Sequence, residues 1–326
     1  MYLLAANITF NMPSVNTQDE KKLQQGINMK TFNKIIISLA LFLYMNAIYA
    51  QSILTEFNIE FCRGDNLPLL MDIAYPDNIS NRPPVPAVIL IHGGSWRGGL
   101  RAGMFDKASE LATNGYFAAT IDYRLTHLIE RDGADPMKAG VDYRKMIQDV
   151  KCAVRHLKTE ANKYNIDSLR IATFGTSAGG HLAATMGVNR TPWHDQNRQY
   201  QDVDSSVAAV VSWFGPQDLQ YNYDNVPFSQ FFIAELLDGT PLEFPDRYYN
   251  TSPINFLSPN DPPMITIHGT DDETVPVEVA IAFDEACAAQ GIRHVLEIIE
   301  GGTHGFPMNS AIAMDKTIRF LDSVFR

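Results

Sequence analysis

Short apolar runs alternate with amphipathic segments along most of this chain, and this alternation constrains its fold more than any other feature. The runs "VPAVILIH" (85–92) and "VAAVVSWF" (207–214) are apolar at nearly every position. Such runs are typical of strands buried on both faces of a parallel sheet. The segment 137–160 carries apolar residues such as Met146 and Val150 at helical spacing. Strand–helix–strand repetition predicts an α/β fold, a mostly parallel sheet with helices on both faces.

The predicted elements run from residue 56 to the C-terminus. Strands are expected at 56–61, 69–75, 85–92, 116–125, 169–174, 207–214, 263–269 and 294–300. Helices are expected at 104–114, 137–160, 178–186, 227–237, 276–290 and 310–325. The segment 216–262 breaks the alternation with prolines and aromatic residues. It is predicted to be a small lid-like insertion above the sheet, with one short helix near 227–237 and with most of its aromatic side chains packed inward.

The N-terminal region has the pattern of an export signal. Residues 29–50 run from two lysines through an apolar stretch to small residues near Ala50, which is the order of a secretory signal peptide. The apolar stretch is short for a membrane span, although an uncleaved N-terminal anchor is the alternative interpretation. Residues 1–28 are predicted to be a disordered extension, with Met29 as an alternative start. We therefore expect a secreted or periplasmic protein with one domain over 51–326 and no stable membrane insertion after cleavage.

Charge and cysteine content exclude several classes of protein. The net charge is −11, and no block of lysine and arginine is present, so nucleic-acid binding has no electrostatic support. The three cysteines, Cys62, Cys152 and Cys287, lie far apart and match no zinc-site spacing. An odd number leaves at least one thiol without an intrachain partner. Each cysteine is interpreted as a small buried apolar residue.

The stretch "FGTSAGGH" (174–181) directly follows an apolar strand. It contains G-x-S-x-G between a predicted strand and a predicted helix, the context in which this motif presents a nucleophilic serine on a sharp turn. A merely tight turn is the alternative, and a phosphate-binding loop is excluded because no lysine follows the glycines. Ser177 is the predicted nucleophile. His181, one helical turn later, is assigned a packing role.

A nucleophilic serine needs a base and an acid that orients the base. His304 in "EGGTHGF" follows the last predicted strand, and "HGTDDETVP" (268–276) follows the strand before it. Asp272 is the predicted acid, and Asp218 is the reserve candidate. The alternative role for the acids of 271–273 is to cap the next helix.

The loop "HGGSWRGG" (92–99) follows another buried strand, and its glycines leave backbone N–H groups free. The N–H groups of Gly94, Ser95 and Ala178 are expected to form an oxyanion cradle. His92 is interpreted as a brace for the loop. Trp96 is expected to contact substrate, either as a pocket wall or as a lid, and the sequence leaves both open.

Five ordered motifs, "HGGSW", "DYRL", "GTSAGGHLA", "HGTDDETVP" and "GGTHGF", together resemble the α/β-hydrolases of the esterase and lipase superfamily. Within it the chain is similar to the bacterial branch with acetyl-xylan and feruloyl carbohydrate esterases, which is related to the hormone-sensitive-lipase-like group. The resemblance implies Ser177 as nucleophile, Asp272 as acid and His304 as base, with no metal or cofactor. Two residues depart from the lipase-like group, Ser95 in place of glycine and Thr176 in place of an acid, and both favour the carbohydrate-esterase-like branch.

The resemblance predicts a serine esterase that acts on small esters or on ester side chains of polysaccharides. Its specificity is expected to come from the 216–262 insertion, Trp96 and Trp193. Amide hydrolysis, as in aryl-formamidases or prolyl-oligopeptidase-like peptidases, is the second interpretation. A non-catalytic binder on the same fold is the third, although such proteins normally lose a member of the triad.

Overall fold

The computed structural model describes residues 52–64, 67–126, 143–188, 199–305 and 310–326. The predicted N-terminal extension and signal peptide, Trp193 and the start of the 137–160 helix lie outside the described residues. The described residues belong to one compact unit.

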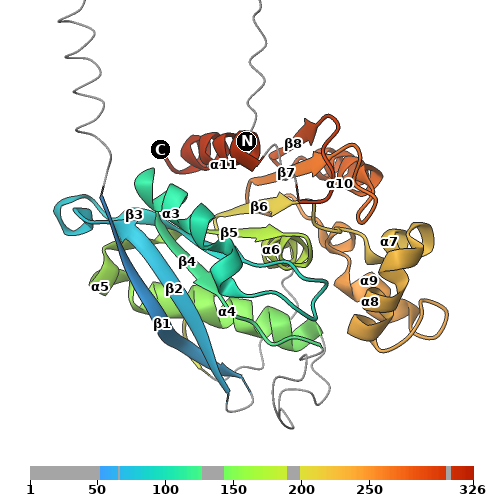
Figure 1. The fold of residues 1–326 in the computed structure, drawn as a ribbon, viewed down its shortest axis with the longest axis horizontal. Helices are drawn as coiled ribbons and strands as arrows, with labels where there is room; N and C mark the ends of the chain where they lie inside the picture. Colours follow the sequence, from blue (N-terminus) through green and yellow to red (C-terminus); the bar gives the residue numbers. More distant parts are fainter. Residues whose placement is uncertain (1–51, 65–66, 127–142, 189–198, 306–309) are drawn as a thin grey trace, which may run out of the picture. The chain divides into compact units, whose positions relative to one another are not determined.

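The centre of the fold is an eight-stranded sheet in the order β1-β2-β4-β3-β5-β6-β7-β8 (Figure 1). The strands are β1 (Ile53–Gly64), β2 (Leu67–Pro76), β3 (Val85–Ile91), β4 (Phe117–Ile121), β5 (Ile166–Thr176), β6 (Ala209–Trp213), β7 (Met264–Gly269) and β8 (His294–Ile299). β2 is antiparallel to β1 and to β4, and all the other pairs are parallel. The predicted, mostly parallel sheet is confirmed.

Helices cover both faces of the sheet, as predicted (Figure 1). They are α3 (Phe105–Thr113), α4 (Tyr143–Thr159), α5 (Ala161–Tyr164), α6 (Ala178–Val188), α10 (Val277–Ala289) and α11 (Ser310–Phe325). Residues of α3 and α11 form the core on one face, and residues of α4, α6 and α10 contribute to the core on the other. β3 shows why its run is continuously apolar: Ile89 and Ile91 belong to one core, whereas Val88 and Leu90 belong to the other.

The insertion is more helical than predicted. It holds α7 (Leu219–Asn225), α8 (Pro227–Leu237) and α9 (Pro245–Thr251), followed by the 3-10 helix η5 (Pro253–Phe256), whereas only the helix at 227–237 was expected. Each extra helix is too short for apolar periodicity to be recognised, but each has a start signal. Asp218 Oδ1 accepts a hydrogen bond from the Tyr221 N–H at 3.0 Å and caps α7, and Pro245 is the first residue of α9.

The interpretation of Cys62 and Cys152 as simple apolar residues is wrong. The two form a disulfide that joins β1 to α4 across 90 residues of sequence. Cys287 is buried and free, as expected. No local spacing pattern could reveal the pair, because only the packing of α4 beneath the sheet brings the two cysteines together.

Loss of this disulfide should destabilise the domain. A crosslink across 90 residues limits the unfolded chain, and removing it is expected to lower the free energy of unfolding by about 3 to 5 kcal/mol. The measurement is urea unfolding of residues 51–326 and of the double variant C62S/C152S. Dithiothreitol should lower the wild-type midpoint and leave that of the double variant unchanged. Equal midpoints for oxidised and reduced wild type would contradict the assignment.

Candidate active site

Ser177 lies on a sharp turn between β5 and α6, in a left-handed backbone conformation with φ of +53°. The flanking glycines are required by close backbone approach. A Cβ at Gly175 would lie 1.9 Å from the carbonyl oxygen of Gly179, and a Cβ at Gly179 would lie 2.1 Å from that of Ile91. The predicted strand–turn–helix context of the serine is therefore confirmed.

The structure brings Ser177, His304 and Asp272 together. His304 Nε2 lies 3.0 Å from Ser177 Oγ, and His304 Nδ1 lies 2.8 Å from Asp272 Oδ2. The three side chains come from the carboxyl ends of β5, β7 and β8, which meet at one edge of the sheet. The reserve acid, Asp218, is occupied as the cap of α7 and does not take part in this chain of contacts.

Asp272 is held in its charged form by the groups around it. Burial alone favours the neutral acid, but hydrogen bonds with His268, His304 and the Val275 N–H outweigh it and lower the pKa of Asp272 well below its usual range. Its Oδ1 accepts the N–H groups of Thr274 and Val275, both at 2.9 Å. The alternative role as a helix cap is wrong for Asp272, because α10 begins at Val277 without a side-chain cap hydrogen bond. Asp272 Oδ1 instead holds the turn before that helix, while Oδ2 contacts His304.

His268 is a supporting residue that the sequence reasoning missed. It is fully buried; its Nε2–H donates to the Val275 carbonyl at 2.8 Å and lies 3.3 Å from Asp272 Oδ2. His268 lies at the end of β7 and therefore holds the turn that carries Asp272 against this strand. The available signal was a histidine four residues before the acid in "HGTDD".

The loop after β3 has the shape expected of an oxyanion cradle. Gly94, Ser95 and Trp96 all have positive φ, at +125°, +52° and +59°, and the Gly98 N–H closes the turn on the Gly94 carbonyl at 2.9 Å. Ala178 is the first residue of α6, where helix N–H groups have no intrahelical partner. Among the residues the structure describes, the N–H groups of Gly94, Ser95 and Ala178 donate to no other backbone carbonyl.

His92 braces this loop, as predicted. Its ring stacks on Tyr123 with centroids 4.4 Å apart, and the Tyr123 hydroxyl donates to the His92 carbonyl at 3.0 Å. Burial lowers the pKa of His92 to about 4, so the ring remains neutral at physiological pH.

Trp96 is a fixed wall of the pocket and not a lid. Its side chain is only 4% exposed, and its indole N–H donates to His181 Nδ1 at 3.2 Å. His181 in turn donates from Nε2 to the Thr251 carbonyl at 2.7 Å, at the end of α9. Burial lowers the pKa of His181 to about 4, and its hydrogen bond to Thr251 opposes the shift only in part. The packing role predicted for His181 therefore has a specific form, a neutral ring that joins the cradle loop to the insertion.

Replacing His181 by leucine should reduce turnover. Loss of both hydrogen bonds frees Trp96 and the cradle next to it, and small misplacements in a reactive geometry cost up to about 100-fold in rate. We expect kcat for p-nitrophenyl acetate to fall 10- to 100-fold with a small change in KM. His181→Gln, which can both accept and donate, should restore part of kcat. Equal kcat values for the leucine variant and the wild type would contradict this positioning role.

A small pocket of about 20 Å³ opens beside Ser177. Its walls include Ser95, Trp96, Ser177 and Ala178 from the site, with Pro216, Asn222, Ser229, Phe232, Thr274 and Val275. The insertion thus lines the pocket through α7 and α8, as expected from its position in the sequence.

The cradle loop is also tied to α8. Arg97 forms an ion pair with Glu235 at 2.9 Å, and its guanidinium lies over the rings of Phe231 and Phe232 at 5.1 and 5.6 Å. The insertion and the loop that carries Gly94 and Ser95 therefore hold each other in place.

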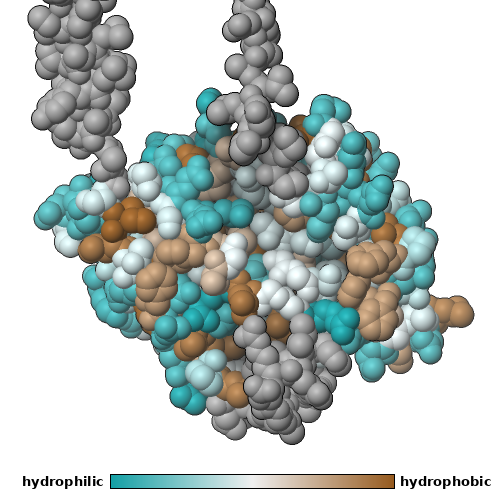
Figure 2. All heavy atoms as spheres, in the orientation of Figure 1, coloured by the Kyte–Doolittle hydropathy of each residue, from teal (hydrophilic) through white to brown (hydrophobic). Residues whose placement is uncertain are grey.

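The aromatic residues of the insertion are less buried than expected. Tyr248 is buried and packs against Tyr223, but Phe228 and Phe231 are 65% and 60% exposed. Both contact Phe232 edge to face, at 5.2 and 5.5 Å, so an aromatic surface runs outward from the pocket. Figure 2 shows hydrophobic side chains among hydrophilic ones over the α7–α9 segment.

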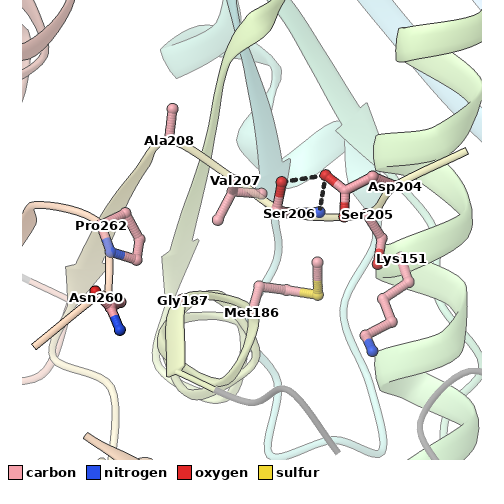
Figure 3. Close-up of a pocket in the computed structure, with 10 residues that line it drawn as sticks. All are labelled: Lys151, Met186, Gly187, Asp204, Ser205, Ser206, Val207, Ala208, Asn260 and Pro262. Carbon is pink, nitrogen blue, oxygen red and sulfur yellow. Dashed lines mark hydrogen bonds between the residues drawn. The ribbon is translucent and has the colours of Figure 1, made fainter. Parts of the chain in front are cut away.

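A larger hollow of about 620 Å³ lies at the opposite end of the sheet (Figure 3). Its lining residues precede β6 and β7 or lie on α4 and at the end of α6: Lys151, Met186, Gly187, Asp204, Ser205, Ser206, Val207, Ala208, Asn260 and Pro262. No histidine stands beside its serines in this lining. This larger hollow is not the candidate active site, which lies at the carboxyl edge of the sheet with Ser177.

Two further features concern the part of the chain that the structure describes. There, no cluster of three or more His, Cys, Asp or Glu side chains is arranged to hold a metal ion. No helix in the same ranges combines the length and hydrophobicity needed to span a membrane.

The sheet order and the serine elbow define an α/β-hydrolase. The chain belongs to the BD-FAE family, whose model matches residues 71–287. Esterase LipC of Mycobacterium tuberculosis is 30% identical over 277 residues, which are 81% of this chain and 64% of that protein. The chain spans less than two thirds of the length of LipC, and 44% of the carboxylic ester hydrolase LipM of the same organism.

Solved structures share the fold over most of the chain. A truncated carbohydrate esterase from gut microbiota has a TM-score of 0.69 and 26% identity, with 84% of this chain and 96% of that one covered. Native esterase 2 of Thermogutta terrifontis has a TM-score of 0.66 and 25% identity, with 84% and 91% covered. All of these similar proteins are named as esterases or carboxylic ester hydrolases.

Proposed function

We propose that the protein is a serine carboxylic ester hydrolase with Ser177, His304 and Asp272 as its triad. The observation that carries the proposal is the continuous chain of contacts from Ser177 Oγ through His304 to Asp272, at 3.0 and 2.8 Å. A serine, a base and a buried carboxylate in this order are the parts that acyl transfer requires.

The reaction proceeds through an acyl-enzyme. Ser177 Oγ bonds to the ester carbonyl carbon while its proton passes to His304 Nε2. The bond to the alcohol then breaks, and His304 returns the proton to the leaving oxygen. In the second half, His304 takes a proton from water as its oxygen attacks the acyl carbon, and the acid leaves as Ser177 is reprotonated. Asp272 stays ionised and holds the His304 ring in the required tautomer.

The negative charge of each tetrahedral intermediate is held by backbone donors. Gly94, Ser95 and Ala178 supply N–H groups toward this position, and the start of α6 adds its positive dipole. Loss of one donor from such a cradle typically costs about 3 kcal/mol of transition-state stabilisation. Backbone groups suit this role because they are fixed before the reaction begins.

The substrates we propose are short-acyl or aromatic esters of carbohydrates. The small volume beside Ser177 favours a short group there, since about 10 to 15 Å³ holds one water. Trp96 and the aromatic surface of Phe228, Phe231 and Phe232 suit a sugar face or a phenolic ring. The similarity to a carbohydrate esterase supports the same class.

We also propose that the protein works outside the cytoplasm. The signal-like segment 29–50 and the disulfide between Cys62 and Cys152 favour the same compartment, because disulfides persist in oxidising environments.

A substrate panel tests the proposed function. Hydrolysis of p-nitrophenyl acetate, methyl ferulate, acetylated xylan and N-formylkynurenine is compared for the mature chain. Esterase function predicts turnover of p-nitrophenyl acetate, and the carbohydrate proposal predicts release of acetate from xylan or of ferulate from its ester. Preference for N-formylkynurenine would instead support amide hydrolysis. No turnover of any substrate would support a non-catalytic binder.

A further inference from the structure

The pocket beside Ser177 contains a polar side chain that the proposed mechanism does not use. Asn222 on α7 lines this pocket together with Ser177 and Trp96, and the residue is only 2% exposed. Its Oδ1 atom is buried, and within the described ranges no group donates a hydrogen bond to it.

An unpartnered buried amide oxygen is unfavourable in the free protein. The backbone of Asn222 is satisfied, because its N–H donates to the Asp218 carbonyl and its carbonyl accepts the Val226 N–H, both at 3.1 Å. Within the described residues, the atom of Asn222 that is buried without a partner is Oδ1. A leucine of similar size could occupy the same position on α7 without leaving a polar atom unpaired.

The surroundings indicate which chemical group would complete the site. Trp96, Pro216, Phe232 and Val275 give the pocket apolar walls. Ser229, also in the lining, donates its hydroxyl proton to the Thr274 carbonyl at 3.0 Å, so its oxygen keeps only acceptor capacity toward the pocket. The lining of this small and largely apolar space thus includes two residues whose side-chain oxygens can accept a hydrogen bond, Asn222 and Ser229.

We propose that Asn222, assisted by Ser229, selects substrates that carry a free hydroxyl group close to the ester. The hydroxyl donates to Asn222 Oδ1 while the ester carbonyl lies at Ser177. Such a hydroxyl occurs on the alcohol side in a partly esterified polyol or sugar, and on the acyl side in a hydroxy acid. This inference rests on the proposed esterase function and narrows its substrate class. A site built for a hydroxyl discriminates strongly against an analogue that lacks it, because the buried acceptor is then left unpaired.

Two pairs of nearly isosteric esters test the proposal. They also distinguish a hydroxyl on the alcohol side of the ester from one on the acyl side. 2-Hydroxyethyl acetate is compared with propyl acetate for the alcohol side, and methyl glycolate with methyl propanoate for the acyl side. kcat/KM is measured by pH-stat titration, and within each pair the value for the hydroxylated ester is divided by the value for its partner. This ratio is then divided by the corresponding ratio of rate constants for hydrolysis by hydroxide, which gives the corrected preference. This division removes the intrinsic effect of the hydroxyl on ester reactivity.

For the wild type, the corrected preference for the hydroxylated ester should be at least about 10-fold in one pair. In Asn222→Leu the same corrected preference should fall close to one. Asn225→Leu is the matched control, because Asn225 is exposed on the same helix and its amide donates to the Tyr221 carbonyl. That variant should keep the wild-type preference.

Corrected wild-type preferences close to one in both pairs would overturn the proposal, and this result does not depend on the folding of any variant. A preference that survives in Asn222→Leu would overturn the assignment to Asn222. Hydrolysis of p-nitrophenyl acetate separates the two levels of inference. If it proceeds without a hydroxyl preference, this proposal alone fails. If the wild type does not hydrolyse it at all, the proposed function fails and this inference with it.

Discussion

Replacing Ser177 by alanine is expected to lower kcat/KM for p-nitrophenyl acetate by about 10⁵-fold or more, because removal of a triad nucleophile leaves only binding and oxyanion stabilisation. The Oγ atom that lies 3.0 Å from His304 Nε2 is the only atom that the variant removes. The fold should persist, since an alanine side chain can occupy the same turn. Initial rates and a thermal unfolding curve of both proteins provide the measurement.

Ser205→Ala is the matched control for this substitution. Ser205 lines the larger hollow at the opposite end of the sheet, so its loss should leave kcat/KM unchanged. If Ser177→Ala retained wild-type activity while folded, Ser177 would not be the nucleophile.

The second large effect is expected for Asp272→Asn, with a fall in kcat of about 10⁴-fold. An asparagine keeps the size of the side chain but places an amide next to His304, so the ring is held in the wrong tautomer and its cationic form is no longer stabilised. The pH profile adds a separate test. Because hydrogen bonds lower the pKa of Asp272, its carboxylate stays charged as the pH falls through the ordinary aspartate range. Protonation of Asp272 should therefore not contribute to a fall in kcat/KM within that range.

Two neighbouring acids serve as controls for this prediction. Within the described residues, the Asp271 carboxylate accepts only a local hydrogen bond from Thr270 at 2.9 Å, so Asp271→Asn should change kcat little. Asp218→Asn should weaken the cap of α7 and leave the chemistry in place. A 10⁴-fold loss for Asp218→Asn, with Asp272→Asn active, would reverse the assignment of the acid.

Most of the fold could be predicted because its pattern is local. β3 and β6 are continuous apolar runs with cores on both faces, and α4 and α11 have clear helical spacing. The insertion was predicted less well, because α7 and α9 have seven residues each and bury too few side chains for a period to be visible. The disulfide could not be predicted because 90 residues separate its cysteines.

The difference between features set by a local sequence pattern and features set by tertiary contacts also applies to the site. Ser177, Asp272 and His304 could be picked out because each follows a strand in a short, unusual motif, and strand ends converge in a parallel sheet. The partners of these residues depend on tertiary contacts. His268 beneath Asp272 and His181 behind Trp96 lie inside these motifs, and Asn222 lies in the insertion, but only packing gives the three residues their positions.

The central claim is that His304 activates Ser177 for attack on an electrophilic centre, and covalent labelling tests it most directly. A protein of residues 51–326 is treated with paraoxon and digested, and the peptides are analysed by mass spectrometry. The expected result is one diethylphosphoryl group on Ser177, formed as nitrophenolate leaves, with labelling lost in His304→Ala. The account would be contradicted if the protein hydrolysed p-nitrophenyl acetate but paraoxon labelled another residue. It would also be contradicted if Ser177 were labelled equally in His304→Ala and in the wild type.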